Sequence, residues 1–151
     1  MAATSPAEPK ATVVGVDGSS ASQHALEWAV RRSAVTNDPV IAVRAWQAPT
    51  DYATGGLLVP EAEWETAAIE AMAATVAEVH AAYPAVPVQQ RVVKGDPAQV
   101  LVQEAANAGL LVVGSRSRGE LRSVLLGSVS WKCVHSARCP VLVIRDGTQT
   151  I

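Results

Sequence analysis

The residues best suited to chemistry lie between Gly114 and Ser128, where a glycine-rich loop follows an apolar run and leads into a predicted helix. We expect this helix at Ser128 to Ser136, with Ser128 as its N-cap. A loop of small residues before a helix N-terminus presents unpaired backbone N–H groups, and the helix dipole adds partial positive charge. Three arginines in the loop add further positive charge. The stretch therefore predicts a site for nucleotide phosphates.

Three familiar motifs do not fit this loop. A P-loop needs Lys and then Ser or Thr after its second glycine, but Glu120 and Leu121 follow Gly119. The glycines near the N-terminus do not combine with Gly114 into a dinucleotide-binding fingerprint. A nucleophile elbow around Ser117 would need glycine two residues earlier, where this chain has Ser115. These mechanisms are excluded, which leaves a different phosphate loop or a plain connection as the alternatives.

Length and composition indicate one globular domain. The chain has 151 residues, 49% of them hydrophobic, and a formal net charge of −2. This length buries roughly 70% of the unfolded surface, so a core forms without disulfides or metals. The near-neutral charge argues against nucleic-acid binding, and the absence of a long apolar run or signal-peptide core predicts a cytoplasmic protein without a membrane anchor. We expect a domain at residues 11–146 between a disordered tail, 1–10, and a second tail, 147–151.

The chain lacks the residue patterns of common catalytic and metal sites. Cys133 and Cys139 do not form a CxxC pair, so two buried, reduced thiols are expected. The three histidines have no partner at metal-ligand spacing, which predicts no protein-only metal site. Neither a general base poised beside a phosphate nor a two-carboxylate site is indicated. We therefore expect a non-enzyme, with slow hydrolysis or self-phosphorylation left open.

Five apolar runs alternate with four helical patterns along the chain. The expected strands are 12–16, 40–46, 88–93, 110–114 and 140–144, and the helices begin near Ser20, Pro60, Pro97 and Ser128. Ser20 opens a capping-box pattern, Asp96 is a predicted N-cap, and Gly109 is a predicted C-cap. Strict alternation of this kind predicts an α/β fold: a five-stranded parallel sheet in the order 3-2-1-4-5, with helices on both faces.

The predicted strand order brings two suggestive loops together. Asp17 follows the first strand and Gly114 ends the fourth, and these strands are neighbours in the order 3-2-1-4-5. Their connections leave in opposite directions, which opens the crevice where ligands usually bind in such sheets. The sequence therefore predicts one ligand site at Asp17 and Gly114.

The residues after the first and fourth predicted strands resemble those of the universal stress protein family. ATP-binding members of that family carry the pattern G-x2-G-x9-G-[S/T] after the fourth strand. Gly114, Gly127 and Ser128 match that pattern, whereas Ser117 stands at its second glycine. Asp17 matches the aspartate that family members carry after the first strand, and 138–143 resembles the closing strand. The resemblance implies a flavodoxin-like, adenine nucleotide alpha hydrolase-like fold that binds ATP, with or without Mg²⁺.

The loop and the resemblance together give a set of expected binding residues. Asp17 would accept hydrogen bonds from ribose or the adenine amino group, Ala45 would lie at the adenine, and the remainder would hold ribose and phosphates. At Ser117 two outcomes are open, a weakened phosphate site or a hydroxyl that donates to phosphate. The expected site residues are Val16, Asp17, Ala45, Val113, Gly114, Ser115, Arg116, Ser117, Gly127, Ser128 and Val129.

The resulting functional hypothesis is a cytoplasmic ATP-binding universal stress protein that acts as a sensor or regulator. The alternatives are a dimeric partner-binding member that does not bind ATP and, with less support, an ATP-pyrophosphatase-type enzyme. In the predicted order the fifth strand is a sheet edge, and an apolar edge invites strand pairing. We therefore expect a homodimer through Val141, Leu142, Val143 and Ile144, as the resemblance also implies.

Overall fold

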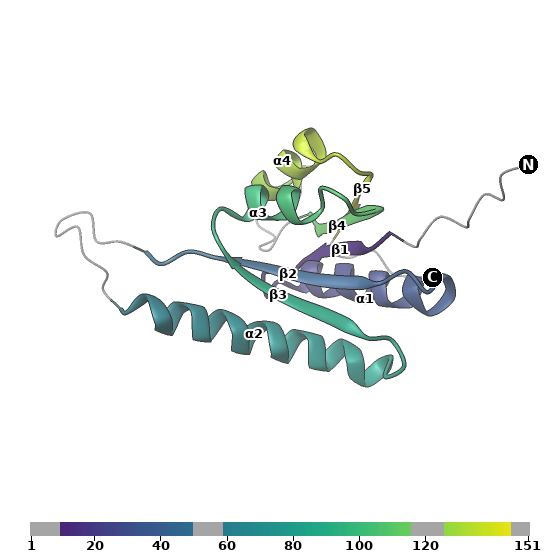
Figure 1. The fold of residues 1–151 in the computed structure, drawn as a ribbon, viewed down its shortest axis with the longest axis horizontal. Coiled ribbons are helices and arrows are strands. Elements are labelled where there is room, and N and C mark those ends of the chain that lie inside the picture. The colour runs from purple at the N-terminus through teal and green to yellow at the C-terminus, as the bar shows by residue number, and fades with distance from the viewer. Residues whose placement is uncertain (1–9, 50–58, 116–125, 146–151) are drawn as a thin grey trace, which may run out of the picture.

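The computed structural model describes residues 10–49, 59–115 and 126–145 and has an alternating βα architecture (Figure 1). The five strands form one parallel sheet in the order β3-β2-β1-β4-β5, which confirms the predicted fold class and strand order. The elements are β1 (Thr12–Gly15), α1 (Ser20–Thr36), β2 (Val40–Trp46), α2 (Glu61–Ala82), β3 (Val88–Lys94), α3 (Pro97–Glu104), β4 (Leu110–Gly114), α4 (Ser128–Ser136) and β5 (Val141–Ile144).

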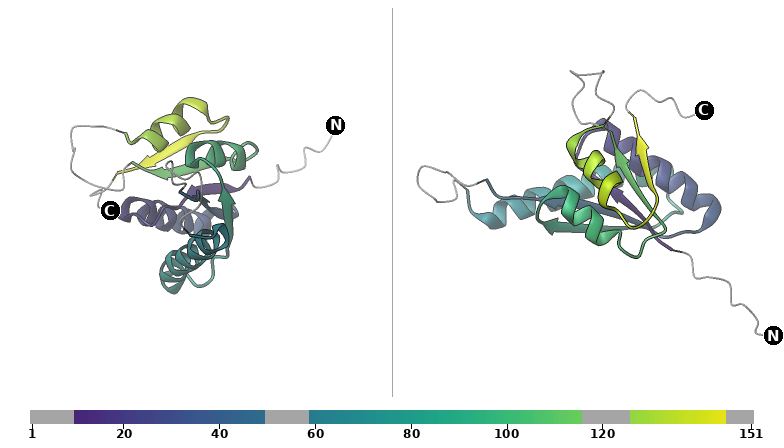
Figure 2. Two further views of the ribbon diagram at one scale, coloured as in Figure 1. Left: turned by 90° about the vertical axis from the view of Figure 1, so that its left-hand side faces the viewer. Right: turned by 90° about the horizontal axis from the view of Figure 1, so that it is seen from above.

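The two faces of the sheet are covered unequally. Helices α1 and α2, of 17 and 22 residues, lie on one face, and α3 and α4, of 8 and 9 residues, lie on the other (Figures 1 and 2). Strand side chains alternate between the two cores, as Ala42 packs with α1 and α2 while Val43 packs with α3 and α4. The central strands β1 and β4 are therefore mostly apolar on both faces, as in other parallel sheets, whereas the edge strand β3 has exposed polar residues.

The first helix is capped by Ser19, so the predicted cap at Ser20 is one residue too late. Ser19 has extended backbone angles, and its Oγ accepts a hydrogen bond from the Ser22 N–H at 3.1 Å. Ser20 is already the first helical residue. Because either serine could supply the hydroxyl, the backbone conformation decides which one caps the helix.

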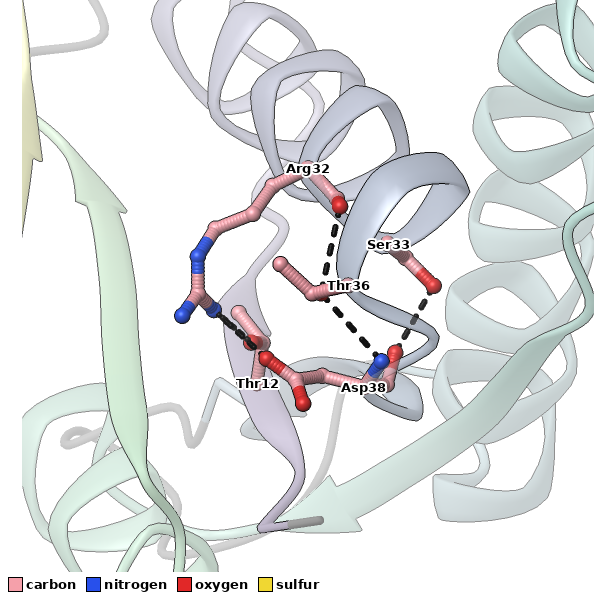
Figure 3. Close-up of polar contacts among 5 residues, drawn as sticks. All are labelled: Thr12, Arg32, Ser33, Thr36 and Asp38. Atoms are coloured by element: carbon pink, nitrogen blue, oxygen red, sulfur yellow. Dashed lines mark hydrogen bonds and ion pairs between the residues drawn. The ribbon is translucent and has the colours of Figure 1, made fainter.

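A closed polar network joins the end of α1 to the start of β1 and β2 (Figure 3). Arg32 Nη1 lies 3.1 Å from Asp38 Oδ2 and donates to Thr12 Oγ1 at 3.2 Å. Ser33 Oγ donates to the Asp38 carbonyl at 2.7 Å, and Thr36 Oγ1 accepts from the Asp38 N–H at 3.3 Å. The network fixes the α1–β2 connection at the amino end of the sheet.

Helix α3 begins as predicted but ends earlier. Asp96 caps it by accepting from the Gln99 N–H at 3.1 Å, and Pro97 is the first helical residue. The C-cap is Ala105, not Gly109. Gly109 instead donates its N–H to the Ala11 carbonyl at 2.9 Å, and a Cβ there would stand 2.9 Å from the Lys10 Cβ. Because its N–H bonds to Ala11 and not to a helix carbonyl, Gly109 belongs to the connection between α3 and β4.

The cysteines are both free, and they differ in burial. Cys133 is fully buried in α4, and burial first, then the charge of Asp96, raises the pKa of its thiol to about 11. Cys139 is only partly buried, so the prediction of two buried thiols was wrong for it. Within the described ranges, no helix is both long and apolar enough to cross a membrane.

Candidate functional site

A pocket opens at the carboxyl ends of β1, β2 and β4, where the sequence predicted a ligand crevice. Its cavity volume is about 120 Å³. Six of the expected site residues line it together: Val16, Asp17, Ala45, Val113, Gly114 and Val129. Residues far apart in the chain are therefore neighbours here, because the order β2-β1-β4 places these strand ends side by side.

The pocket also has lining residues that the sequence analysis did not identify. They are Gly15, Ser22, Val43, Pro97 and Leu101. Val43 could have been found by strand alternation, since it lies two residues before Ala45 on the same face. The others depend on packing between elements, which the sequence pattern does not specify.

The walls of the pocket are largely apolar. Val43, Ala45 and Val113 rise from the sheet, and Pro97 and Leu101 close the cavity from α3. A Cβ on Gly15 would stand 2.8 Å from Leu101 Cδ1, so a larger residue in β1 would force the Leu101 side chain to shift within the cavity. Proline offers no N–H to a ligand. These walls suit a flat apolar group, such as an aromatic ring, better than a charged one.

Asp17 places a carboxylate at the rim of the apolar pocket. Its Oδ1 accepts from the Ser19 N–H at 2.9 Å, and its own N–H donates to Ser22 Oγ at 3.2 Å. Partial burial alone would raise the pKa of this carboxyl, but hydrogen bonds from Ser19 and Ser22 and the charge of Arg44 outweigh it, so the pKa lies below its usual value. The exposed Asp17 side chain is thus a fixed, ionised hydrogen-bond acceptor.

Gly114 has a packing role in addition to its position at the pocket. A Cβ there would stand 2.8 Å from the backbone carbon of Ala21 and 2.9 Å from the Ser22 N atom. Backbone atoms cannot move aside as a flexible side chain can, so glycine is required at this position for the end of β4 to pack against α1. This requirement holds whether or not a ligand binds.

The two ends of the predicted phosphate loop are joined by hydrogen bonds. Gly127 donates its N–H to the Ser115 carbonyl at 2.8 Å, and Ser130 Oγ donates to the same carbonyl at 3.3 Å. Ser115 in turn donates to the Ile144 carbonyl at 2.8 Å, which anchors it to β5. Arg116 and Ser117, both expected to contact phosphate, lie outside the described residues.

Helix α4 begins directly after this junction. Its N-cap is Gly127, with extended angles, and Ser128 is its first residue, so the predicted Ser128 cap is wrong by one position. Gly127 has no side chain with which to cap the first-turn N–H groups. Val129 in that turn lines the pocket, whereas Ser128 is exposed. The N-terminus of a nine-residue helix therefore borders the pocket.

Comparison with known proteins identifies the family. The Universal stress protein family pattern matches residues 9–145. The chain belongs to the universal stress protein family. Universal stress protein Rv2005c of Mycobacterium tuberculosis is 40% identical over 134 residues, covering 89% of this chain and 45% of that protein. The chain thus spans about half the length of the curated relatives that it matches.

Solved structures of family members share the fold. A universal stress protein in complex with cAMP is similar at a TM-score of 0.68 and 25% identity, covering 91% of this chain and 98% of that one. The Archaeoglobus fulgidus universal stress protein in complex with dAMP has a TM-score of 0.65 at 19% identity, covering 89% and 97%. The second likeness is one of fold alone.

The described part of this universal stress protein offers no obvious site for a metal held by the chain itself. Residues 10–49, 59–115 and 126–145 contain no group of three or more His, Cys, Asp or Glu side chains placed to hold one.

Proposed function

We propose that this universal stress protein binds an adenine nucleotide, ATP in particular, in the pocket between β1, β2, β4 and α3. The observation that carries the proposal is the convergence of Asp17, Gly114 and the N-terminus of α4 on one apolar cavity. An apolar slot with a few fixed polar groups is typical of small-molecule sites. The family member in complex with cAMP supports the same ligand class.

The parts of the nucleotide fit different parts of the pocket. The apolar walls from Ala45 to Leu101 suit the adenine ring, and the Asp17 carboxylate suits the donors of ribose or of the adenine amino group. A cavity of about 120 Å³ is smaller than a typical ligand pocket, so the phosphates would extend outward over Gly127 and the first turn of α4. Backbone N–H groups at a helix N-terminus favour that negative charge.

We infer a sensor or regulator in the cytoplasm, not a catalyst. In this proposal Asp17 lies at the base or ribose and not beside the phosphates, and its Oδ1 accepts a hydrogen bond from the Ser19 N–H. A ligand that binds the folded state stabilises it and shifts its population, which is sufficient for a sensor. Slow turnover would then be incidental to binding.

We also propose a homodimer through β5. Strand β5 is an edge of the sheet, and its four apolar residues are only partly buried. Trp131 and Val134, on the neighbouring helix α4, are 56% and 50% exposed. Pairing two β5 edges about a two-fold axis would cover this apolar surface. Light scattering should report a dimer, and Leu142→Pro should give the 15.7 kDa monomer.

The test of nucleotide binding is isothermal titration with ATP, ADP, AMP and adenosine. ATP should bind with measurable heat, and Gly127→Arg should abolish it, because the arginine side chain would fill the space expected for phosphate. Gln89→Arg, on the exposed edge of β3, adds the same charge away from the pocket and should bind normally. If none of these ligands gives heat with the wild type at millimolar concentration, the proposal fails.

A further inference from the structure

Arg44 is a partly buried cation that the fold places behind the pocket. It lies in β2 between Val43 and Ala45, both of which line the cavity. Strand alternation puts its side chain on the opposite face, the face covered by α1 and α2. Its Nη1 atom is buried and makes no hydrogen bond with any described residue. Buried polar atoms are nearly always paired, so this one needs a physical explanation.

The guanidinium packs against the turn that carries the pocket carboxylate. A Cβ on Gly18 would stand 3.4 Å from Arg44 Nη1 and 3.9 Å from Nη2. Gly18 has φ +84°, in the left-handed region that favours glycine. The β1–α1 turn therefore passes over the guanidinium with little room between them, and Asp17 is the residue immediately before this contact.

The charge of Arg44 acts on the Asp17 carboxylate. The carboxylate is oriented by the Ser19 N–H at 2.9 Å, and the Arg44 guanidinium lies beside the same turn at Gly18. Burying a cation is unfavourable unless a nearby negative charge offsets it. Asp17 supplies that charge from across the turn, and no ion pair joins it to Arg44 among the described residues.

We propose that Arg44 is a positioning residue for the nucleotide pocket, holding the β1–α1 turn from behind and offsetting the negative charge of Asp17 when phosphates approach. This inference rests on the proposed nucleotide binding. A nucleotide brings several negative charges to a site whose principal side-chain acceptor is a carboxylate. Without Arg44 the repulsion between Asp17 and the phosphates would be stronger. The effect of Arg44 should therefore grow with the charge of the ligand.

The first experiment compares ATP with adenosine by isothermal titration. Arg44→Gln should weaken ATP binding about tenfold but change adenosine binding much less, and Arg44→Lys should retain most of the ATP affinity. Arg91→Gln removes a cation paired with Glu104 on the other face and should leave both affinities unchanged. Equal losses for ATP and adenosine would overturn the charge-offset role.

A double-mutant cycle tests whether Arg44 acts through Asp17. In an Asp17→Asn background, Arg44→Gln should lose most of its effect on ATP affinity, because the charge to be offset is gone. An undiminished effect in that background would overturn the proposal. If Arg44→Gln does not fold, Arg44→Met takes its place, because it keeps an unbranched apolar stem and removes the charged guanidinium.

A measurement without nucleotide separates this inference from the proposed function. The ¹³C carboxyl resonance of Asp17 reports its titration directly. Arg44→Gln should move the midpoint to higher pH, whereas Arg91→Gln should not. If the wild type binds no nucleotide but the midpoint moves, the proposed function fails and the coupling of Arg44 to Asp17 stands. If the midpoint does not move, the positioning role is wrong.

Discussion

The two ends of the β1–β2 strand pair use the same residue types in opposite ways. At the amino end, Arg32 pairs directly with Asp38 at 3.1 Å and donates to Thr12 (Figure 3). At the carboxyl end, Arg44 Nη1 has no partner among the described residues, and Asp17 bonds to the backbone of its own turn. At the amino end of the strands an arginine and an aspartate thus bond to each other, whereas at the carboxyl end the arginine and the aspartate form no ion pair among the described residues.

This difference indicates that the polar residues at the amino end stabilise the fold, whereas those at the carboxyl end are available to a ligand. A polar network whose members satisfy one another rigidifies the fold and has little left for a ligand. A network with an unpartnered donor and an exposed carboxylate is less favourable in the free protein, and such departures from local consistency concentrate at functional sites. Two sets of substitutions and a change of pH test this contrast between the two ends.

The largest effect is expected at Gly114, where the end of β4 packs against α1 at the carboxyl end of the sheet. Gly114→Ala places a Cβ 2.8 Å from the Ala21 backbone, so β4 and α1 must separate. We expect the free energy of unfolding to fall by about 3 kcal/mol in urea denaturation. Gly127→Ser is the matched control, because Gly127 has φ −73°, and it should change stability by less than about 1 kcal/mol. A smaller loss for Gly114→Ala than for the control would contradict the packing role.

The second change compares the two arginines directly. Arg32→Met removes the ion pair with Asp38 and the bond to Thr12, and should lower the free energy of unfolding by about 1 kcal/mol. Arg44→Met removes a guanidinium whose buried Nη1 has no hydrogen bond among the described residues, so its stability should stay within about 0.5 kcal/mol of the wild type or rise. Urea denaturation of both variants is the measurement. Equal losses would mean that the two ends are alike.

The smallest effect is expected from acid. The pKa of Asp17 lies below its ordinary value of 3.8, so this carboxyl adds stability that is fully present above that pH. The contribution is lost as the pH falls through the lowered pKa, when the folded state takes up the proton. In urea denaturation between about pH 5 and pH 3, Asp17→Asn should therefore lose less stability than the wild type. Parallel pH profiles for the two proteins would show that Asp17 is not held as described.

The fold was predictable because each element repeats the same local signals. Apolar strands alternating with helical stripes predicted the order β3-β2-β1-β4-β5, which lets helices cover both faces, and that order brought Asp17 and Gly114 together. The caps of α1 and α4 were each misplaced by one residue, because adjacent residues could serve and only the backbone angles decide between them.

The remaining features of the site depend on distances between elements. Leu101 enters the pocket because Gly15 lets α3 approach β1, and no periodicity in either segment specifies that approach. Alternation assigns Arg44 to the face opposite the pocket, but not the guanidinium position beneath Gly18. Such contacts depend on how elements distant in the sequence pack together. The sequence therefore predicts the location of the site better than the contacts of its charged side chains.

The unequal helices have a consequence for motion. The outer wall of the pocket is formed by α3 and α4, of 8 and 9 residues, whereas the opposite face carries helices of 17 and 22 residues. Short helices with little buried surface unfold locally at low free energy, so amide hydrogens in α3 and α4 should exchange with deuterium sooner than those of α1 and α2. A ligand held between the sheet and α3 would then slow exchange in the most readily opened layer of the protein. A ligand in the pocket would thus keep the outer surface of α3 and α4 ordered, and an empty pocket would leave that surface more often unfolded.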